Sequence, residues 1–369
     1  MTAAPHRFEF TEVRKEEFGS QALHRRLIAS APRRLAFDEQ ASCRGWATKV
    51  RDKLTELLRM PERSSAQPSV EMLGDRKNMG DHVAQDLVFE SEPGVLVPCR
   101  LLLPAKAAGP LPVMICLQGH TTGMHISLGE VVHARDVEDL GGDRDFALQA
   151  VRRGYAALAM EQRAFGLRSD GRPDCCRRTL DLEVNDDNHT CKHTAMTALL
   201  LGRTLLGERV FDVIRACDAV AQIEDLDAGR INVMGNSGGG TVAWYAAAVE
   251  PRIKGAIVAS CFCTVERSIG AIDHCTDNYL PGMLQWFDFA DIAGAIETAR
   301  VAVVMGRHDP LFPHDGVDEA FEHARKIFAA QGRPGDIVFA QGEGGHRFYE
   351  GVGWQAFEAL MARSDTPAS

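Results

Sequence analysis

The sequence lacks the features that mark several protein classes. Its 369 residues hold only ten cysteines, far below the density of small domains stapled by disulfides, so a disulfide scaffold is excluded. No stretch approaches the ~20 apolar residues that span a bilayer. Residues 1–10 contain no apolar core of a secretory signal. We therefore expect a cytoplasmic protein with reduced thiols and no membrane partner.

Basic residues are outnumbered by acidic ones. Forty-one Lys and Arg stand against 51 Asp and Glu, which gives a formal net charge of -10. Such a surface repels phosphate backbones, so we expect no nucleic-acid partner. Hydrophobic residues make up 45% and charged residues 25%, which is typical of globular proteins and excludes disorder or a coiled coil as a description of the whole chain.

Residues 1–85 differ from the rest because they are rich in Arg, Glu and Ala and hold no strand-like apolar runs. Within residues 37–60, apolar side chains recur at spacings of three and four, which predicts an amphipathic helix that ends at Pro61. This apolar stripe consists of Trp46, Val50, Leu54, Leu57 and Leu58. Residues 61–81 are turn-rich and are predicted to be a link. The helical extension either caps the functional site, packs on the flank of the fold or forms the face of a homodimer, and the sequence leaves these alternatives open.

From residue 86 onward, strand and helix patterns alternate. Two strand-like stretches, residues 87–90 and 95–103, flank a turn and predict a hairpin. The other predicted strands are residues 113–117, 155–160, 230–234, 254–260, 300–305 and 336–340. The predicted helices are residues 146–153, 194–223, 241–249, 317–330 and 354–362. This alternation predicts an α/β fold in residues 86–369, with a mostly parallel central sheet and helices on both faces.

The strongest local motif is Gly-Asn-Ser-Gly-Gly-Gly at residues 235–240, between a predicted strand and a predicted helix. It matches the G-x-S-x-G nucleophile elbow, in which a sharp turn leaves no room for side chains at the glycines and holds the serine hydroxyl exposed. We therefore predict that Ser237 is a nucleophile. An ordinary glycine-rich turn is the alternative. A phosphate-binding loop is disfavoured because the Gly-Lys-Ser/Thr ending is absent.

A serine nucleophile needs an imidazole that accepts its proton and a carboxylate that orients the imidazole. Asp309 and His346 each follow a predicted strand and come after Ser237 in the order that an α/β-hydrolase requires. We predict that these two residues are the acid and the base. The rivals are His308 as the base and Asp273 or Glu266 as the acid.

Acyl transfer also builds negative charge on the carbonyl oxygen, so two backbone N–H donors are needed to face that oxygen. One is predicted to be Gly238, the residue after the nucleophile. The other is expected in the loop that begins at Gln118, and we assign it to the backbone N–H of His120. Whether the imidazole of His120 also takes part stays open.

These motifs together resemble an α/β-hydrolase of the group that includes dienelactone hydrolases and acetyl xylan esterases. The resemblance covers about residues 86–365. It rests on the oxyanion loop, the elbow, the Asp-Pro pair at residues 309–310 and the Gly-Gly-His run at residues 344–346. Dienelactone hydrolases carry cysteine where this chain has Ser237, which favours ester over lactone chemistry. The usual His-Gly pair of the oxyanion loop is Gln118-Gly119 here.

Two insertions, residues 164–193 and 264–289, follow the ends of predicted strands. Substrate-binding loops are expected at these ends. We predict that their aromatic residues Phe165, Tyr279 and Trp286 contact the substrate. The pocket wall is expected to include Cys261, Cys263, His274 and Cys275.

No metal and no other cofactor is expected. Five potential ligands gather in the first insertion, but their spacing matches no standard zinc motif. These residues are Cys175, Cys176, His189, Cys191 and His193.

The sequence therefore predicts a serine hydrolase that cleaves a small carboxylic ester through an acyl-enzyme intermediate. Two alternatives stay open. The same triad supports carbon–carbon bond hydrolysis or acyl transfer, because this fold accommodates many reactions. A non-catalytic protein that binds ligands with the same fold is the other alternative.

Overall fold

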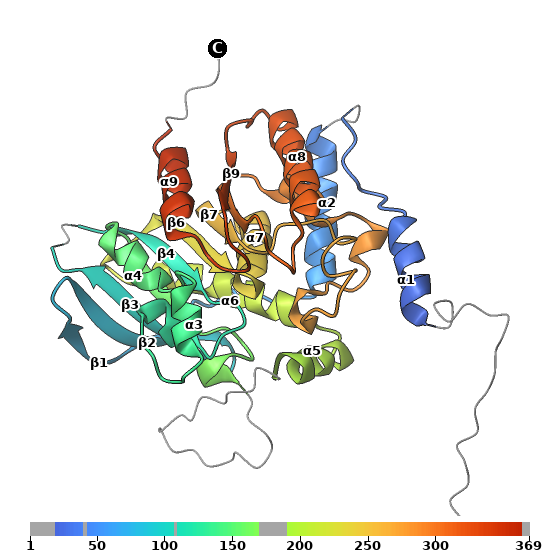
Figure 1. The fold of residues 1–369 in the computed structure, drawn as a ribbon. Coiled ribbons are helices and arrows are strands. Elements are labelled where there is room, and N and C mark those ends of the chain that lie inside the picture. Colours follow the sequence, from blue (N-terminus) through green and yellow to red (C-terminus); the bar gives the residue numbers. More distant parts are fainter. Residues whose placement is uncertain (1–18, 40–42, 107–108, 170–189, 364–369) are drawn as a thin grey trace, which may run out of the picture.

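A computed structural model describes residues 19–39, 43–106, 109–169 and 190–363. In this described part of the chain, nine strands form one sheet (Figure 1). The strands are β1 (Val70–Asn78), β2 (His82–Glu92), β3 (Val95–Pro104), β4 (Leu111–Leu117), β5 (Ala156–Met160), β6 (Leu226–Asn236), β7 (Ile253–Ala259), β8 (Arg300–Gly306) and β9 (Ile337–Gly342).

The strand order is β1-β2-β3-β5-β4-β6-β7-β8-β9. Strands β1 to β3 pair antiparallel, and β3 also pairs antiparallel with β5. From β5 across the sheet to β9, every pair is parallel. The carboxyl ends of these parallel strands meet at one edge, so the loops that follow them lie together there.

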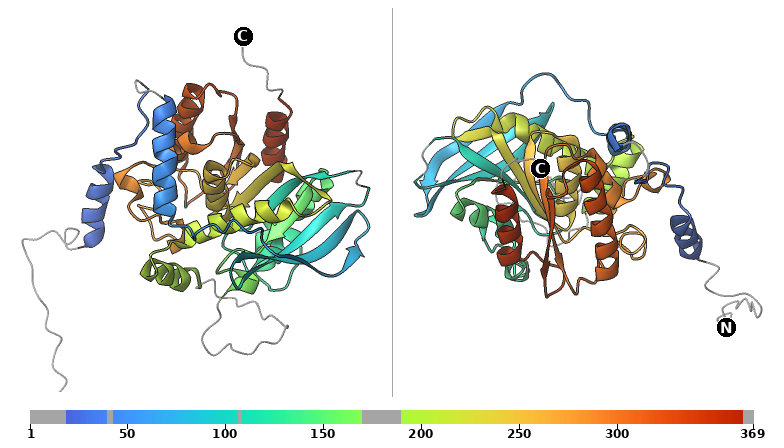
Figure 2. Two further views of the ribbon diagram at one scale, coloured as in Figure 1. Left: turned by 180° about the vertical axis from the view of Figure 1, so that it is seen from behind. Right: turned by 90° about the horizontal axis from the view of Figure 1, so that it is seen from above.

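Helices cover both faces of the sheet. The α-helices are α1 (Ser20–Ala29), α2 (Cys43–Leu58), α3 (Asp136–Gly141), α4 (Phe146–Arg152), α5 (Thr190–Leu200), α6 (Leu205–Val220), α7 (Gly238–Val249), α8 (His314–Ala330) and α9 (Glu350–Met361). Short 3-10 helices are η2 (Met124–Leu128), η3 (Gly166–Arg168), η4 (Thr276–Asn278), η5 (Met283–Gln285) and η6 (Phe289–Ala295). One apolar cluster joins α4 and α9 to the sheet, and a larger one joins α2, α6, α7 and α8 to it (Figures 1 and 2). The predicted α/β fold class is confirmed.

The central strands are apolar because both faces of the sheet are covered. Every residue of β5 is buried, and β4 is buried from Val113 to Leu117. Continuous burial of this kind is typical of parallel strands between two layers of helices. Each fully buried Val or Leu side chain contributes about 1.5–3 kcal/mol to folding. No helix in the described ranges has the length and hydropathy of a membrane span.

Helix α2 packs its predicted apolar stripe on the flank of the fold. All five residues of the stripe are buried. The Trp46 ring lies against Gly294 of η6, where any side chain would collide with it. The Nε1 of Trp46 donates a hydrogen bond to Leu35 O at 2.8 Å. The described part of the extension thus lies beside the fold, and the division of the chain at residue 85 stays a prediction.

The predicted link at residues 61–81 contains a strand, so the sheet begins at Val70 and not after residue 85. This strand, β1, lies at the edge of the sheet, and all of its residues after Val70 are exposed. An edge strand with both faces in water carries no alternating apolar pattern, and the sequence therefore did not reveal it.

The single helix predicted at residues 194–223 is two helices, α5 and α6. Gly202, with φ 76°, adopts the left-handed backbone that follows many helix ends. Thr204 then begins α6, because its hydroxyl accepts a hydrogen bond from the N–H of Gly207 at 2.9 Å.

Candidate active site

Ser237 lies in the turn between β6 and α7, with φ 56° and ψ -123°. A positive φ is strained for a residue with a side chain and is held here by its surroundings. The turn is so tight that a side chain at Gly235 would collide with the backbone of Gly239. The N–H of Ser237 donates to Ala259 O at 2.8 Å, which ties the turn to β7. This is the geometry that the G-x-S-x-G motif predicts.

Asp309 and His346 meet on the loops after β8 and β9. Oδ2 of Asp309 accepts a hydrogen bond from Nδ1 of His346 at 2.8 Å. The other carboxylate oxygen accepts from the backbone N–H of Leu311 at 2.9 Å and of Phe312 at 3.3 Å. Because a carboxylate only accepts, the ring proton lies on Nδ1, and Nε2 is left to take a proton from a hydroxyl.

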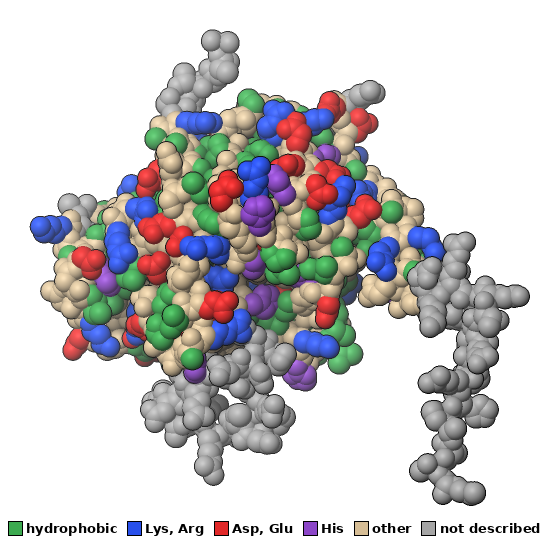
Figure 3. All heavy atoms as spheres, viewed as in Figure 1, with side chains coloured by type: hydrophobic (Ala, Val, Ile, Leu, Met, Phe, Trp, Pro, Cys, Tyr) green, Lys and Arg blue, Asp and Glu red, His purple; other side chains and the backbone are tan. Residues whose placement is uncertain are grey.

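Ser237 and His346 line one cavity of about 410 Å³. Its walls also include Arg135, Arg144 and Leu311. Figure 3 shows Arg, His and acidic side chains together near the middle of one face of the molecule. The described side chains of Ser237 and His346 share no hydrogen bond, and such contacts often tighten only when substrate is bound.

The rival acids and the rival base do not form a comparable pair. His308 and Glu266 are exposed. Asp273 is exposed at the rim of the cavity. Of these candidate acids and bases in the described chain, Asp309 and His346 form the hydrogen-bonded pair.

The loop after β4 packs directly on the elbow. A Cβ atom at Gly119 would lie 2.9 Å from the Cβ of Ser237. Gln118 is buried, and its Nε2 donates to Ser127 Oγ at 2.6 Å and to Arg144 O at 2.8 Å. The Gln118 amide therefore anchors the loop, while the absence of a side chain at Gly119 lets the loop approach the nucleophile.

Glu161 follows β5 and holds the same loop. Its buried carboxylate accepts hydrogen bonds from the backbone N–H of Met124 at 3.1 Å and of Leu167 at 3.2 Å. Burial raises the pKa of Glu161 to about 7, although the two N–H donors and the Arg168 guanidinium act in the opposite direction. This carboxyl group therefore titrates near neutral pH.

The imidazole of His120 lies beside the elbow, with Cε1 3.2 Å from the Cβ position of Gly238. Its Nε2 is 3.1 Å from Oδ2 of the buried Asp277. Burial disfavours the imidazolium, but the Asp277 carboxylate outweighs burial and raises the pKa of His120 to about 10. Nη1 of Arg209 donates to the same carboxylate oxygen at 2.5 Å.

Sequence reasoning missed Arg209 and Asp277. They are 68 residues apart in the chain, and no local motif connects them. The side chain of Arg209 is only 1% exposed and lies on α6, where its neighbours are also buried. An arginine inside a predicted apolar helix was the one signal that the sequence offered, because a buried guanidinium requires a partner of opposite charge.

The three predicted substrate contacts do not line the cavity. Phe165 is buried and packs edge-on against His120, with ring centroids 5.3 Å apart. Tyr279 donates its hydroxyl to Ile269 O at 2.9 Å and faces a different cavity, which α1 also lines. Trp286 lies beneath the ammonium of Lys53 at 4.1 Å. These positions do not support substrate binding by the three aromatic residues, because Trp286 contacts the extension, Tyr279 faces a different cavity and Phe165 packs against His120.

The cysteine and histidine residues of the first insertion do not form a group of their own in the described chain. Cys175, Cys176 and His189 lie outside the described residues. His193 is exposed on α5. Cys191 is buried at the start of α5, and its polar partners include Asp277 and Arg209. Of the residues expected in the pocket wall, His274 and Cys275 line the cavity.

A largely parallel sheet, a serine at a strand-to-helix elbow and an acid–imidazole pair on later loops together define an α/β-hydrolase. The profile of the acetyl xylan esterase (AXE1) family matches residues 59–302, and the chain belongs to that family. It is therefore a serine carboxylic ester hydrolase, as the sequence predicts. YtaP of Bacillus subtilis (strain 168), which is described as a hydrolase, is 22% identical over 271 residues, or 72% of this chain and 83% of YtaP.

Solved structures share the fold. A protein of Bacteroides fragilis that is described as an acetyl xylan esterase aligns with a TM-score of 0.71 at 18% identity, over 97% of this chain and 88% of that chain. A glucuronoyl esterase from Solibacter usitatus aligns with a TM-score of 0.60 at 14% identity, over 89% of this chain and 96% of that chain. The predicted resemblance to the acetyl xylan esterase group is confirmed.

Proposed function

We propose that Ser237 attacks the carbonyl carbon of a small carboxylic ester. His346 takes the serine proton on Nε2 and delivers it to the leaving alcohol, while Asp309 orients the imidazole. Water then attacks the acyl-enzyme with His346 as the base, which releases the acid and restores the serine. The observation that carries this assignment is the 2.8 Å hydrogen bond between Asp309 and His346, because His346 lines the cavity that Ser237 also lines.

The negative charge on the carbonyl oxygen is held by the backbone N–H groups of Gly238 and His120. Each such donor lowers the barrier by about 3–4 kcal/mol in serine hydrolases. The close approach of Gly119 to Ser237 supports this arrangement, because it places the loop that carries His120 directly on the elbow.

The substrate is an ester of a short acyl group and a hydroxyl-rich alcohol. Arg135, Glu138, Asp139 and Arg144 make much of the cavity wall polar, which suits the hydroxyl groups of a sugar more than an aliphatic chain. The family name and the named activity of the Bacteroides fragilis relative also point to acetylated carbohydrate. The formal charge of -10 favours a small-molecule substrate over a nucleic acid.

The Ser237→Ala variant tests the nucleophile. We expect turnover of p-nitrophenyl acetate to fall about 10⁶-fold, since the members of such a triad act as a unit. A fluorophosphonate probe is expected to label the wild-type chain at Ser237 and to leave the variant unlabelled. Ser65 is exposed, so Ser65→Ala is the matched control. It is expected to keep both the turnover of p-nitrophenyl acetate and the labelling by the probe. Undiminished turnover by the Ser237 variant refutes the assignment.

Product analysis tests the substrate class. Acetylated xylo-oligosaccharides are expected to release acetate and the free sugar, with slower release as the acyl chain of the ester lengthens. A ketone-bearing product from a carbon–carbon substrate, or transfer of the acyl group to an added alcohol in place of water, contradicts simple ester hydrolysis.

A further inference from the structure

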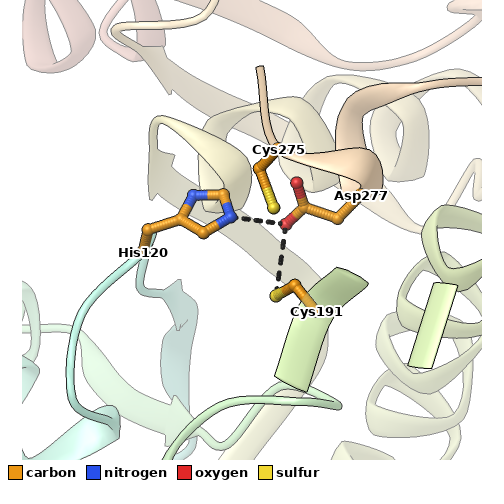
Figure 4. Close-up of side chains that lie close together, drawn as sticks. All are labelled: His120, Cys191, Cys275 and Asp277. Carbon is orange, nitrogen blue, oxygen red and sulfur yellow. Dashed lines mark hydrogen bonds and ion pairs between the residues drawn. The ribbon is translucent and has the colours of Figure 1, made fainter. Parts of the chain in front are cut away.

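Four side chains with metal-binding atoms converge beside the elbow (Figure 4). Nε2 of His120, Sγ of Cys191, Sγ of Cys275 and a carboxylate oxygen of Asp277 all lie within 4.8 Å of one another. They come from three separate segments: the loop after β4, the start of α5 and the segment around η4. Figure 4 shows their side chains pointing from different sides toward a common point. We propose that these four residues bind one zinc ion.

The donor atoms lie close to the spacing of a tetrahedral zinc site, with one pair slightly nearer and one slightly farther apart than that spacing. Zinc bonds of about 2.0–2.3 Å place neighbouring ligand atoms about 3.3–3.8 Å apart. Nε2 of His120 and Oδ2 of Asp277 are 3.1 Å apart, and Sγ of Cys191 is 3.9 Å from the same oxygen. All donor pairs lie within 4.8 Å, so binding of an ion requires the side chains to close by about 1 Å at most.

Nε2 of His120 is buried and makes no hydrogen bond of acceptable geometry with the described residues, although Asp277 Oδ2 is only 3.1 Å away. A buried polar atom normally has a partner. Two ligands of one ion are expected to lie side by side in this way, because each directs its lone pair at the metal and not at the other ligand. A zinc ion would therefore bind a ring nitrogen that has an ion pair with Asp277 but no well-formed hydrogen bond.

The donor set selects zinc. Magnesium and calcium require oxygen ligands, whereas thiolate, imidazole and carboxylate are all ligands that zinc binds. Cys191 and Cys275 are both free cysteines. The two thiolates and the carboxylate would leave the complex with one net negative charge. The buried Arg209 balances that charge, since it donates to Asp277 Oδ2 and, from Nη2, to Cys191 Sγ at 3.2 Å.

The four ligands fill the coordination sphere, so the ion is structural and leaves no position open for substrate. It joins α5 and the segment around η4 to the loop that carries His120. Cε1 of His120 and Oδ2 of Asp277 lie 3.2 Å and 3.3 Å from the Cβ position of Gly238. An ion that joins these two ligands therefore also holds the loop that carries His120 against the elbow. Only this last role, fixing the backbone N–H of His120, rests on the proposed function.

Metal analysis of the full chain tests the proposal. The protein is produced without a histidine tag in zinc-supplemented medium and purified by ion exchange under reducing conditions. We expect about one zinc ion per chain by mass spectrometry. Cys191→Ala and Cys275→Ala are each expected to lower the content below about 0.1. The control Cys217→Ala, which removes a buried thiol of α6 outside the cluster, is expected to keep the full content.

Cobalt substitution gives a second measurement on the wild-type chain. Co²⁺ bound by two thiolates produces strong charge-transfer bands, which neither cysteine variant should show. A wild-type chain that holds no zinc and gives no such bands overturns the proposal, and the cluster is then a closed ion-pair network of His120, Arg209 and Asp277. Undiminished zinc in both cysteine variants also overturns it. Ser237→Ala is expected to keep its zinc, so failure of the ester mechanism is distinguishable from failure of the metal site.

Discussion

Gly119 lies so close to Ser237 that a Cβ atom added to it would come within 2.9 Å of the serine Cβ and 2.6 Å of Asn236 O. Atoms at these distances overlap, so either the oxyanion loop or the elbow has to move. The same small residue thus sets both the position of the nucleophile and the position of the loop expected to hold the oxyanion. Substitution at Gly119 tests this coupling.

Gly119→Ala is expected to lower kcat for p-nitrophenyl acetate about 10²-fold, because a displacement near 1 Å at a reacting group has an effect of that size. The variant should still fold, with a lower free energy of unfolding. Gly45→Ala is the control, since no atom lies within 4 Å of its Cβ position. Full activity in the Gly119 variant would show that the loop does not help to position the elbow. Steady-state kinetics and urea unfolding measure the two effects.

Asp309→Asn is expected to lower kcat about 10⁴-fold while leaving the fold intact, because the amide no longer fixes the proton of His346 on Nδ1. The backbone N–H groups of Leu311 and Phe312 can still donate to the amide oxygen, which keeps the loop in place. Asp273→Asn at the cavity rim serves as the control and is expected to change kcat little. The opposite result, with Asp273 essential and Asp309 dispensable, would reassign the acid.

The reacting groups were predictable from the sequence because their signals are local or ordered along the chain. Gly235 and Gly239 are required by the turn itself, so the elbow shows in six consecutive residues. Asp309 and His346 follow their strands closely, and the rival base His308 is disfavoured because it is adjacent to Asp309 and neighbouring residues rarely form such a pair. Their roles stay predictions until activity is measured, but the structure brings the two side chains together at 2.8 Å.

The environment of the site was not predictable, because it depends on contacts between distant segments. Cys191 was grouped with its neighbours in the sequence, whereas its partner Asp277 is 86 residues away. Trp286 was expected at the cavity, but its carbonyl accepts a hydrogen bond from Leu35 N at 2.6 Å. The sequence does not show which segment covers an aromatic side chain in a loop. It also holds no pattern that shows where α1 and α2 pack, so the contacts of Trp286 with the extension could not be predicted.

Trp286→Ala is expected to lower the free energy of unfolding and to leave KM unchanged, since the indole contacts Lys53 and Arg34 and no part of the cavity. Loss of these cation–π contacts alone removes about 0.5–2 kcal/mol each. Leu311→Ala is the matched comparison, because Leu311 lines the cavity and its truncation should raise KM severalfold. A severalfold rise of KM in the Trp286 variant would instead place the indole in the substrate path.

Glu161 gives the stability of the protein a pH dependence in the opposite sense to that of a carboxylate whose pKa is lowered in the folded chain. Its pKa is about 7 in the folded chain, because the carboxyl group is buried, against 4.5 as its ordinary value. Between these two pH values the folded chain binds a proton that the unfolded chain has lost. Its contribution to stability is therefore fully present below pH 4.5 and is lost as the pH rises through about 7.

Glu161→Gln removes this titration while keeping an oxygen that can accept from Met124 N–H. The variant should therefore gain stability relative to the wild type by about 3 kcal/mol between pH 4.5 and pH 7. Urea unfolding of both proteins at pH 5 and pH 7.5 measures the change, with the exposed Glu62→Gln as the control. A difference that stays constant or shrinks as the pH rises would mean that the carboxyl group of Glu161 is already ionised throughout this range, and that the N–H groups of Met124 and Leu167, with Arg168, outweigh its burial.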